Sequence, residues 1–268
     1  MTAARRRRPP VAAAILIAIL IAAPAALAAD IPLADRRSSY EQMSAPTRAM
    51  QDDETANPGM LWVLDGDALW GRRAGAADRS CADCHGAAAE SMKGVAARYP
   101  AFDAALGRPV DLEQRIEQCR VERQAAVPFG RESRNLVALT AYVTRQSRGL
   151  PIADMVGQDE RLRPFLEAGR GTFERRQGQL ALSCARCHDD NWGRSLAGIA
   201  MPQGHPTGYP VYRLEWQTMG SLQRRLRNCM IGMRAEPWAY GAPEYLELQV
   251  YLAWRARGMA IEAPAVRP

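Results

Sequence analysis

The sequence predicts an all-α protein built from two tandem units that are related by internal duplication. Three observations support this prediction. One five-residue cysteine motif occurs twice, the residues around it recur at a nearly fixed offset, and the flanking segments have helical periodicity without the alternation typical of strands. At 268 residues, the chain is long enough for two domains of ordinary size.

The chain begins with a predicted export signal over residues 1–28. Arg5 to Arg8 precede an apolar run over residues 11–23 and the small-residue site Ala26-Leu-Ala28, a combination typical of a cleaved secretory signal peptide. Without these four arginines, 31 basic and 29 acidic residues remain, and the net charge falls from +6 to +2. We therefore expect a periplasmic protein that neither binds nucleic acid nor spans the membrane after processing.

Three helices are predicted in the first half. The stretch 61–70 has a helical pattern of apolar residues, and the stretch 111–123 places Leu112, Ile116 and Cys119 on one face. A closing helix contains residues 142–148 and stops at Gly149. The join then falls near Pro151, which predicts an N-terminal domain over 29–150 and a C-terminal domain over 151–268.

The second half repeats this pattern. Nine residues recur 103 positions later: Gly66/Gly169, Trp70/Phe173, Arg72/Arg175, Arg73/Arg176, Gly75/Gly178, Ser80/Ser183, Cys81/Cys184, Cys84/Cys187 and His85/His188. From Tyr99-Pro100, which recurs as Tyr209-Pro210, the offset is 110, and at the closing helix it is 109. The change from 103 to 110 places a turn-rich insertion of the second half between His188 and Tyr209.

The duplicated motif is C-x-x-C-H, the attachment pattern of c-type haem. It consists of Cys81, Cys84 and His85 in the first half, and of Cys184, Cys187 and His188 in the second half. Two thiols bond covalently to the porphyrin, and the adjacent histidine binds the iron. A redox or structural disulfide and a zinc site are the alternatives. They are disfavoured because both copies carry the histidine and no second set of zinc ligands is present. We expect two covalently bound haem c groups in two cytochrome-c-like domains.

The sixth iron ligand is predicted to be a cysteine in each unit. Cys119 and Cys229 occupy equivalent positions, which predicts His/Cys ligation of both irons. Two alternatives stay open: a disulfide between these cysteines, and ligation of the second iron by His205 or by a methionine. The candidate methionines are Met201, Met219, Met230 and Met233. A thiolate lowers the reduction potential of haem, which favours sulfur chemistry over simple electron transfer.

Arginines near Cys229 indicate an oxyanion site in the second half. Arg225 lies one helical turn before Cys229, and Arg255 lies on the closing helix where the first half has Gln146. A pair of guanidinium groups can bind a small oxyanion in a half-buried pocket. The alternative is that these arginines bind haem propionates.

The second half is similar to the SoxA family, the haem proteins of bacterial thiosulfate oxidation. The resemblance covers nearly all of the chain after the signal and is carried by three segments: Cys184-Ala-Arg-Cys-His-Asp-Asp-Asn-Trp-Gly193, Gly204-His-Pro-Thr-Gly-Tyr-Pro-Val-Tyr-Arg-Leu-Glu-Trp216 and Ser221-Leu-Gln-Arg-Arg-Leu-Arg-Asn-Cys-Met230. Because Cys81, Cys84, His85 and Cys119 are all present, the sequence resembles the dihaem form of the family.

The resemblance implies an L-cysteine S-thiosulfotransferase. Thiosulfate is joined oxidatively to a cysteine of the carrier protein SoxYZ, and two electrons pass through haem to the monohaem partner SoxX, with which the chain forms a heterodimer. Cys229 matches the family's persulfide cysteine, Arg225 its substrate-binding arginine, and Arg255 is expected to be a second one. Two alternatives from other classes remain: a dihaem thiosulfate dehydrogenase that makes tetrathionate, and a non-catalytic dihaem electron carrier.

Overall fold

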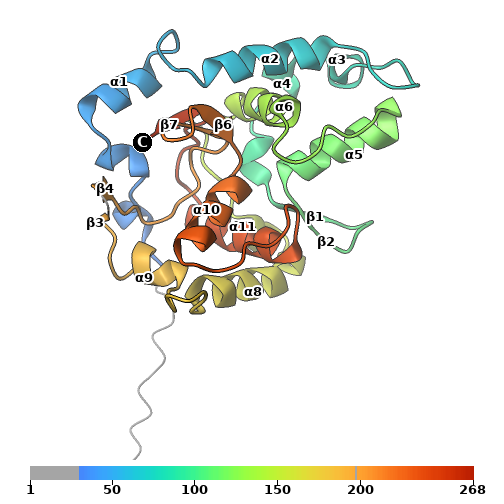
Figure 1. Ribbon diagram of the computed structural model, residues 1–268. Coiled ribbons are helices and arrows are strands. Elements are labelled where there is room, and N and C mark those ends of the chain that lie inside the picture. Colours follow the sequence, from blue (N-terminus) through green and yellow to red (C-terminus); the bar gives the residue numbers. More distant parts are fainter. Residues whose placement is uncertain (1–29, 197) are drawn as a thin grey trace, which may run out of the picture.

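The computed structural model describes residues 30–196 and 198–268 (Figure 1). The predicted signal peptide lies outside these residues. Within the described part of the chain, no helix is both long enough and apolar enough to cross a bilayer.

The helices of the two units follow the order that the duplication predicts. The first half contains α1 (Ala45–Asp52), α2 (Met60–Gly71), α3 (Cys81–His85), α4 (Ala88–Ser91), α5 (Leu112–Gln124) and α6 (Arg134–Arg145). The second half contains α7 (Met155–Gln158), α8 (Arg163–Glu174), α9 (Cys184–His188), α10 (Leu222–Gly232) and α11 (Pro243–Arg255). There are therefore two equivalent pairs of helices. Helices α3 and α9 carry the C-x-x-C-H motifs, and helices α5 and α10 carry Cys119 and Cys229.

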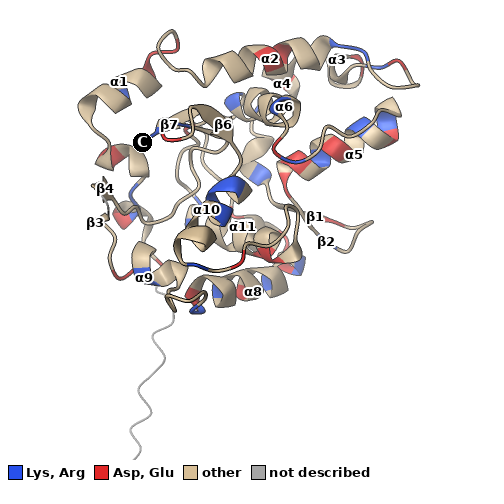
Figure 2. Ribbon diagram, viewed as in Figure 1, with Lys and Arg blue, Asp and Glu red and all other residues tan. Residues whose placement is uncertain are grey.

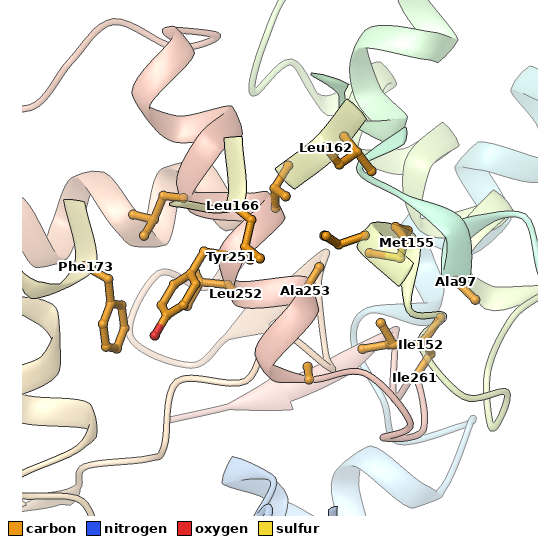
Figure 3. Close-up of a cluster of buried hydrophobic side chains, with 14 of the residues drawn as sticks. Ala97, Ile152, Met155, Leu162, Leu166, Phe173, Tyr251, Leu252, Ala253 and Ile261 are labelled. Carbon is orange, nitrogen blue, oxygen red and sulfur yellow. The ribbon is translucent and has the colours of Figure 1, made fainter. Parts of the chain in front are cut away.

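A crossing of two helices forms the core of each unit. In the first unit α2 packs against α6, and in the second α8 packs against α11. Figure 3 shows Leu166 and Phe173 of α8 lying with Tyr251 and Leu252 of α11 in the apolar core of the second unit. Burial of such side chains stabilises each unit by about 1.5 to 3 kcal/mol per large residue.

Short strands accompany the helices, which the sequence did not indicate. The antiparallel pair β1 (Ala101–Asp103) and β2 (Arg108–Val110) recurs as β5 (Val211–Arg213) and β6 (Thr218–Gly220). The strand β7 (Ala265–Arg267) adds to β5 in parallel, and the insertion forms the hairpin β3 (Ser195–Leu196) and β4 (Ile199–Ala200). Strands of two or three residues are too short to show alternating periodicity.

The segment before α2 packs on the second half as well as on the first unit. The Asn57 amide donates to the Pro264 carbonyl at 3.0 Å, and the Val266 backbone N–H donates to the Gln51 side chain at 3.0 Å. Figure 1 shows this N-terminal segment beside β7. The domain boundaries at 29, 150 and 151 stay a prediction, but residues 30–59 make long-range contacts across them.

A buried polar cluster joins the two units. The Arg131 guanidinium lies 2.8 Å from a carboxyl oxygen of Asp111 and 2.8 Å from one of Glu113, and Gln223 of α10 donates to Asp111 at 3.1 Å. Two carboxyl groups thus share one guanidinium. Burial, reinforced by the negative charge of Asp111, raises the pKa of Glu113 to about 8 although Arg131 opposes the shift.

The raised pKa predicts a pH-dependent stability. Between about pH 4.5, the ordinary value for a glutamate, and about pH 8, the folded protein binds a proton at Glu113 that the unfolded chain releases. The free energy of unfolding should therefore fall as the pH rises through this window. Chemical denaturation at pH 5, 6.5 and 8 measures the slope, which should be smaller in Glu113→Gln. Substitution of Glu122, which is exposed on the same helix, should leave the slope unchanged; equal slopes in all three proteins would contradict the assignment.

Candidate functional site

Each C-x-x-C-H motif folds as a single short helix that is fixed by a serine cap. The Ser80 hydroxyl accepts from the Asp83 backbone N–H at 3.0 Å, and the Ser183 hydroxyl accepts from the Arg186 N–H at 3.2 Å. One helical turn brings the first cysteine and the histidine of each motif to the same cavity wall. The duplicated serine is thus the local reason that both motifs adopt one geometry.

The cavity of the second unit, called the second cavity below, has a volume of about 540 Å³ and is lined by Cys184, His188 and Cys229. The Nδ1 atom of His188 lies 2.7 Å from the Pro202 carbonyl oxygen, which fixes the ring and leaves Nε2 free to bind a metal. Burial lowers the pKa of His188, so its imidazole is neutral, as a metal ligand must be. The stacked ring of Phe173 lies 6.3 Å away. The volume and the donor set fit a haem c.

The first cavity has a volume of about 430 Å³ and is lined by Cys81, Cys84, His85 and Cys119. The His85 ring lies 5.8 Å from the ring of Trp70, whose indole N–H donates to the Gly86 carbonyl at 2.9 Å. This arrangement repeats that of the second unit, where Phe173 stands in place of Trp70. These residues also fit a haem c.

Cys119 and Cys229 line different cavities and are both free thiols. A disulfide between them is therefore absent from the described structure. Each thiol shares its cavity with the motif histidine of its own unit, as the ligation prediction requires.

The remaining candidate ligands of the second unit are placed less favourably. Among the described residues that line the second cavity, none of Met201, Met219, Met230 and Met233 is found. His205 does line it, but the preceding Gly204 packs against the His188 ring, 3.1 Å from the position that a Cβ would take. His205 therefore lies beside His188, whereas the sixth ligand must approach from the opposite face.

Arg225 lines the second cavity together with Cys229. Both residues belong to α10, where they are one turn apart, and Figure 2 shows this helix with basic but no acidic residues. Burial opposes the charge on Arg225, but attraction to Cys229 and Tyr209 raises its pKa above the ordinary value. Arg225 therefore stays charged next to the thiol.

Arg255 is not brought to this cavity. Its guanidinium forms a buried ion pair of 2.6 Å with Asp189, the residue after the motif, and donates to the Tyr251 hydroxyl at 3.3 Å and to the Gln203 carbonyl at 3.3 Å. It also lies over the ring of Phe173, 4.7 Å from the centroid. These contacts support a positioning role behind His188 rather than the predicted contact with substrate.

Two further arginines line the second cavity and were missed from the sequence. Arg213 ends β5, and Arg267 ends β7. Arg267 is bound by Glu262 and Gln51, whereas Arg213 has a buried Nε without a partner in the described structure. Comparison of Arg213 with the equivalent residue of the first unit could have identified it from the sequence. The N-terminal segment also contributes Ser39 and Met43 to the wall.

The chain is similar to a known family model and to curated proteins. The chain matches the family model described as SoxA/TsdA, cytochrome c domain, over residues 65–152 and 168–261. It is 40% identical to the L-cysteine S-thiosulfotransferase subunit SoxA of Pseudaminobacter salicylatoxidans over 236 residues, which are 88% of this chain and 82% of that protein. It is 35% identical to the subunit of the same name from Rhodovulum sulfidophilum over 239 residues, 88% of this chain and 83% of that one.

A solved structure agrees with the sequence relatives. The crystal structure of SoxXA from P. pantotrophus superposes with a TM-score of 0.83 at 31% identity, covering 87% of each chain. The two matched segments and this similarity confirm the predicted fold class of two tandem cytochrome-c-like domains.

Proposed function

Since the chain belongs to the SoxA/TsdA family of cytochrome c domains, we propose that it is the subunit of an L-cysteine S-thiosulfotransferase that couples thiosulfate to a protein cysteine. The single observation that carries this assignment to named residues is the shared cavity of His188, Cys229 and Arg225. The cavity combines a thiol, a cation that has no ion-pair partner among the described residues, and the first cysteine and the histidine of the motif that binds haem c.

The coupling balances as an oxidation. The outer sulfur of thiosulfate forms a bond to the sulfur of the carrier cysteine, the cysteine thiol loses its proton, and two electrons are released. Arg225 binds the sulfonate group, which presents the outer sulfur to Cys229. Cys229, as a persulfide, is the sulfur nucleophile or the covalent relay of the transfer. Haem c, when bound, supplies the electron acceptor for this oxidation.

The haem groups are held by equivalent residues in both units. Cytochrome c domains bind haem c covalently, and we infer two such groups here, because both units carry the complete motif. Cys81, Cys84 and His85 line the first cavity, and Cys184 and His188 line the second. His85 and Cys119 would hold the iron in the first unit, and His188 and Cys229 would hold it in the second. The first haem has a structural or electron-transfer role, because Arg115, the equivalent of Arg225, is neutralised by Asp103 at 2.8 Å.

The partners follow from the relatives. The chain forms a heterodimer with a SoxX cytochrome, as the solved SoxXA structure indicates. We infer that SoxX takes up the electrons, that SoxYZ supplies the carrier cysteine, and that coupling takes place in the periplasm after cleavage of the predicted signal. The names of the relatives favour this transferase over a tetrathionate-forming dehydrogenase and over a simple electron carrier.

Arg225→Leu tests the substrate role. In the purified complex with SoxX, the rate of thiosulfate-dependent modification of the SoxYZ cysteine is followed by intact mass. Loss of a charged hydrogen bond to the sulfonate should raise the KM for thiosulfate about 10- to 100-fold while haem content is retained.

The neighbouring Arg224→Leu is the matched control. The guanidinium of Arg224 lies over the Trp216 ring at 4.5 Å and does not line the cavity, so its KM should be unchanged. Release of tetrathionate by the wild type without modification of the carrier would contradict the proposed transferase activity.

A further inference from the structure

The two units differ in charge at one equivalent strand position. In the first unit β1 ends at Asp103, and in the second unit β5 ends at Arg213. The positions correspond because the strand pairs have the same register, with Asp103 opposite Arg108 and Arg213 opposite Thr218. The duplication thus places an arginine where its sister unit has an aspartate.

In the first unit this aspartate neutralises the arginine next to the haem cavity. The Asp103 carboxylate forms an ion pair of 2.8 Å with the Arg115 guanidinium, and only 8% of the Asp103 side chain is exposed. Hydrogen bonds from the Leu106 and Ala105 backbone N–H groups, together with Arg115, hold the pKa of Asp103 below its usual value. Both groups of the pair are therefore charged, and each neutralises the other.

In the second unit the residue at this strand position does not neutralise Arg225. Arg225 stands where Arg115 stands, and within residues 30–196 and 198–268 its guanidinium has no ion-pair partner. The Arg213 side chain is 8% exposed and donates from one Nη to the exposed carboxylate of Glu215 at 3.0 Å, while its Nε is buried without a partner. Burial and the positive charge of Arg225 both lower the pKa of Arg213, as expected for two cations facing the same space.

Both arginines line the cavity that contains Cys229, and no aspartate or glutamate does so among the described residues. Holding a haem does not by itself require an arginine at this strand position, because the first unit carries the same attachment motif and has Asp103 there. The charge reversal instead supplies what a doubly charged oxyanion needs, which is a second planar donor with a free N–H.

We propose that Arg213 is a second substrate-binding residue, and that it forms with Arg225 the site for the sulfonate group of thiosulfate. The change from aspartate to arginine at this position gives the second unit an oxyanion site. In the first unit, the aspartate Asp103 instead neutralises Arg115. The identity of the anion rests on the proposed function, whereas the anion site itself does not.

The experiment restores the charge pattern of the first unit in the second. Arg213→Asp is prepared as the complex with SoxX, and thiosulfate binding is measured by calorimetry in the absence of SoxYZ, together with KM and kcat for carrier modification. An ion pair between the new aspartate and Arg225 should raise both Kd and KM for thiosulfate by at least about 30-fold, with a smaller change in kcat. Arg213→Lys, which keeps the charge, should recover most of the affinity.

Two controls separate this role from others. Arg163→Asp makes the same change of charge at an exposed position of α8 outside the cavity and should leave Kd unchanged. Haem content and the Soret spectrum report on the cofactor. If Arg213→Asp does not retain haem, the smaller change Arg213→Gln is measured in its place.

The outcomes are distinct. Wild-type Kd for thiosulfate in a haem-loaded Arg213→Asp or Arg213→Gln protein would overturn the inference. So would loss of the second haem in both variants, because Arg213 would then serve the haem. Binding that depends on Arg213 without any carrier modification by the wild type would uphold the anion site and reject the proposed transferase activity.

Discussion

Replacing Cys229 with alanine is expected to lower kcat for modification of the carrier cysteine by at least about 1000-fold. The thiol lines the same cavity as His188 and Arg225, so under the proposed function its removal deletes both the sulfur expected to exchange with substrate and the residue expected to bind the iron of the second haem. The KM for thiosulfate should change much less, because Arg225 remains. The rate of carrier modification and the absorption spectrum of the complex measure the two effects.

The same substitution at the equivalent position provides the comparison. Cys119→Ala alters the first cavity, where the neighbouring Arg115 is paired with Asp103, and should reduce kcat by less than about tenfold. The intact mass of the wild-type chain should show two haems and an additional sulfur atom that Cys229→Ala lacks. Carrier modification by Cys229→Ala at the wild-type rate would refute a covalent role for this sulfur.

Replacing Gly169 with alanine is expected to lower the free energy of unfolding by about 3 kcal/mol. Gly169 lies where α8 crosses α11, and a Cβ there would come within 2.1 Å of the Glu247 carbonyl oxygen and 2.9 Å of the Tyr251 Cβ. The two helices must separate to admit it. Since Phe173 of α8 stacks on His188, the second unit should also lose part of its haem.

Gly171 lies on the same helix and provides a matched control. No atom lies within 4 Å of a Cβ added there, so Gly171→Ala should be neutral or stabilising by up to about 1 kcal/mol. Denaturant titration of the haem-loaded protein measures both variants. Equal stabilities would show that the helix crossing tolerates a methyl group and that its close approach is not required. Gly66, the equivalent residue of the first unit, should behave like Gly169, since a Cβ there would lie 2.3 Å from the Ala138 carbonyl oxygen.

Most of the architecture was predictable from local patterns. The helices over 61–70 and 111–123 are present as α2 and α5 with boundaries shifted by one residue, and the repeat of the latter in the second half is present as α10. The insertion between His188 and Tyr209 is present as a segment with its own hairpin. These features were visible because helical periodicity and a repeated motif are encoded over a few neighbouring residues.

The composition of the cavities was only partly predictable. The residues of each C-x-x-C-H motif lie within one or two helical turns, and so do Arg225 and Cys229. Helix geometry alone therefore brings the members of each group to one face of their own helix. Arg255 was predicted to bind substrate because it has no counterpart in the first half. Its direction, however, is set by Asp189 and the Gln203 carbonyl, which are distant in the sequence.

The repeated pattern was enough to predict two cytochrome-c-like units that each carry a C-x-x-C-H motif, and to predict which residues of one unit correspond to which of the other. Which arginines line the cavity of Cys229, and that the N-terminal segment and β7 complete this cavity, became evident from the folded chain. The physical reason is that a repeat fixes equivalent backbone positions. Whether a guanidinium is neutralised depends instead on partners brought together by packing: Asp103 neutralises Arg115, whereas Arg225 has no ion-pair partner in the part of the chain that the structure describes.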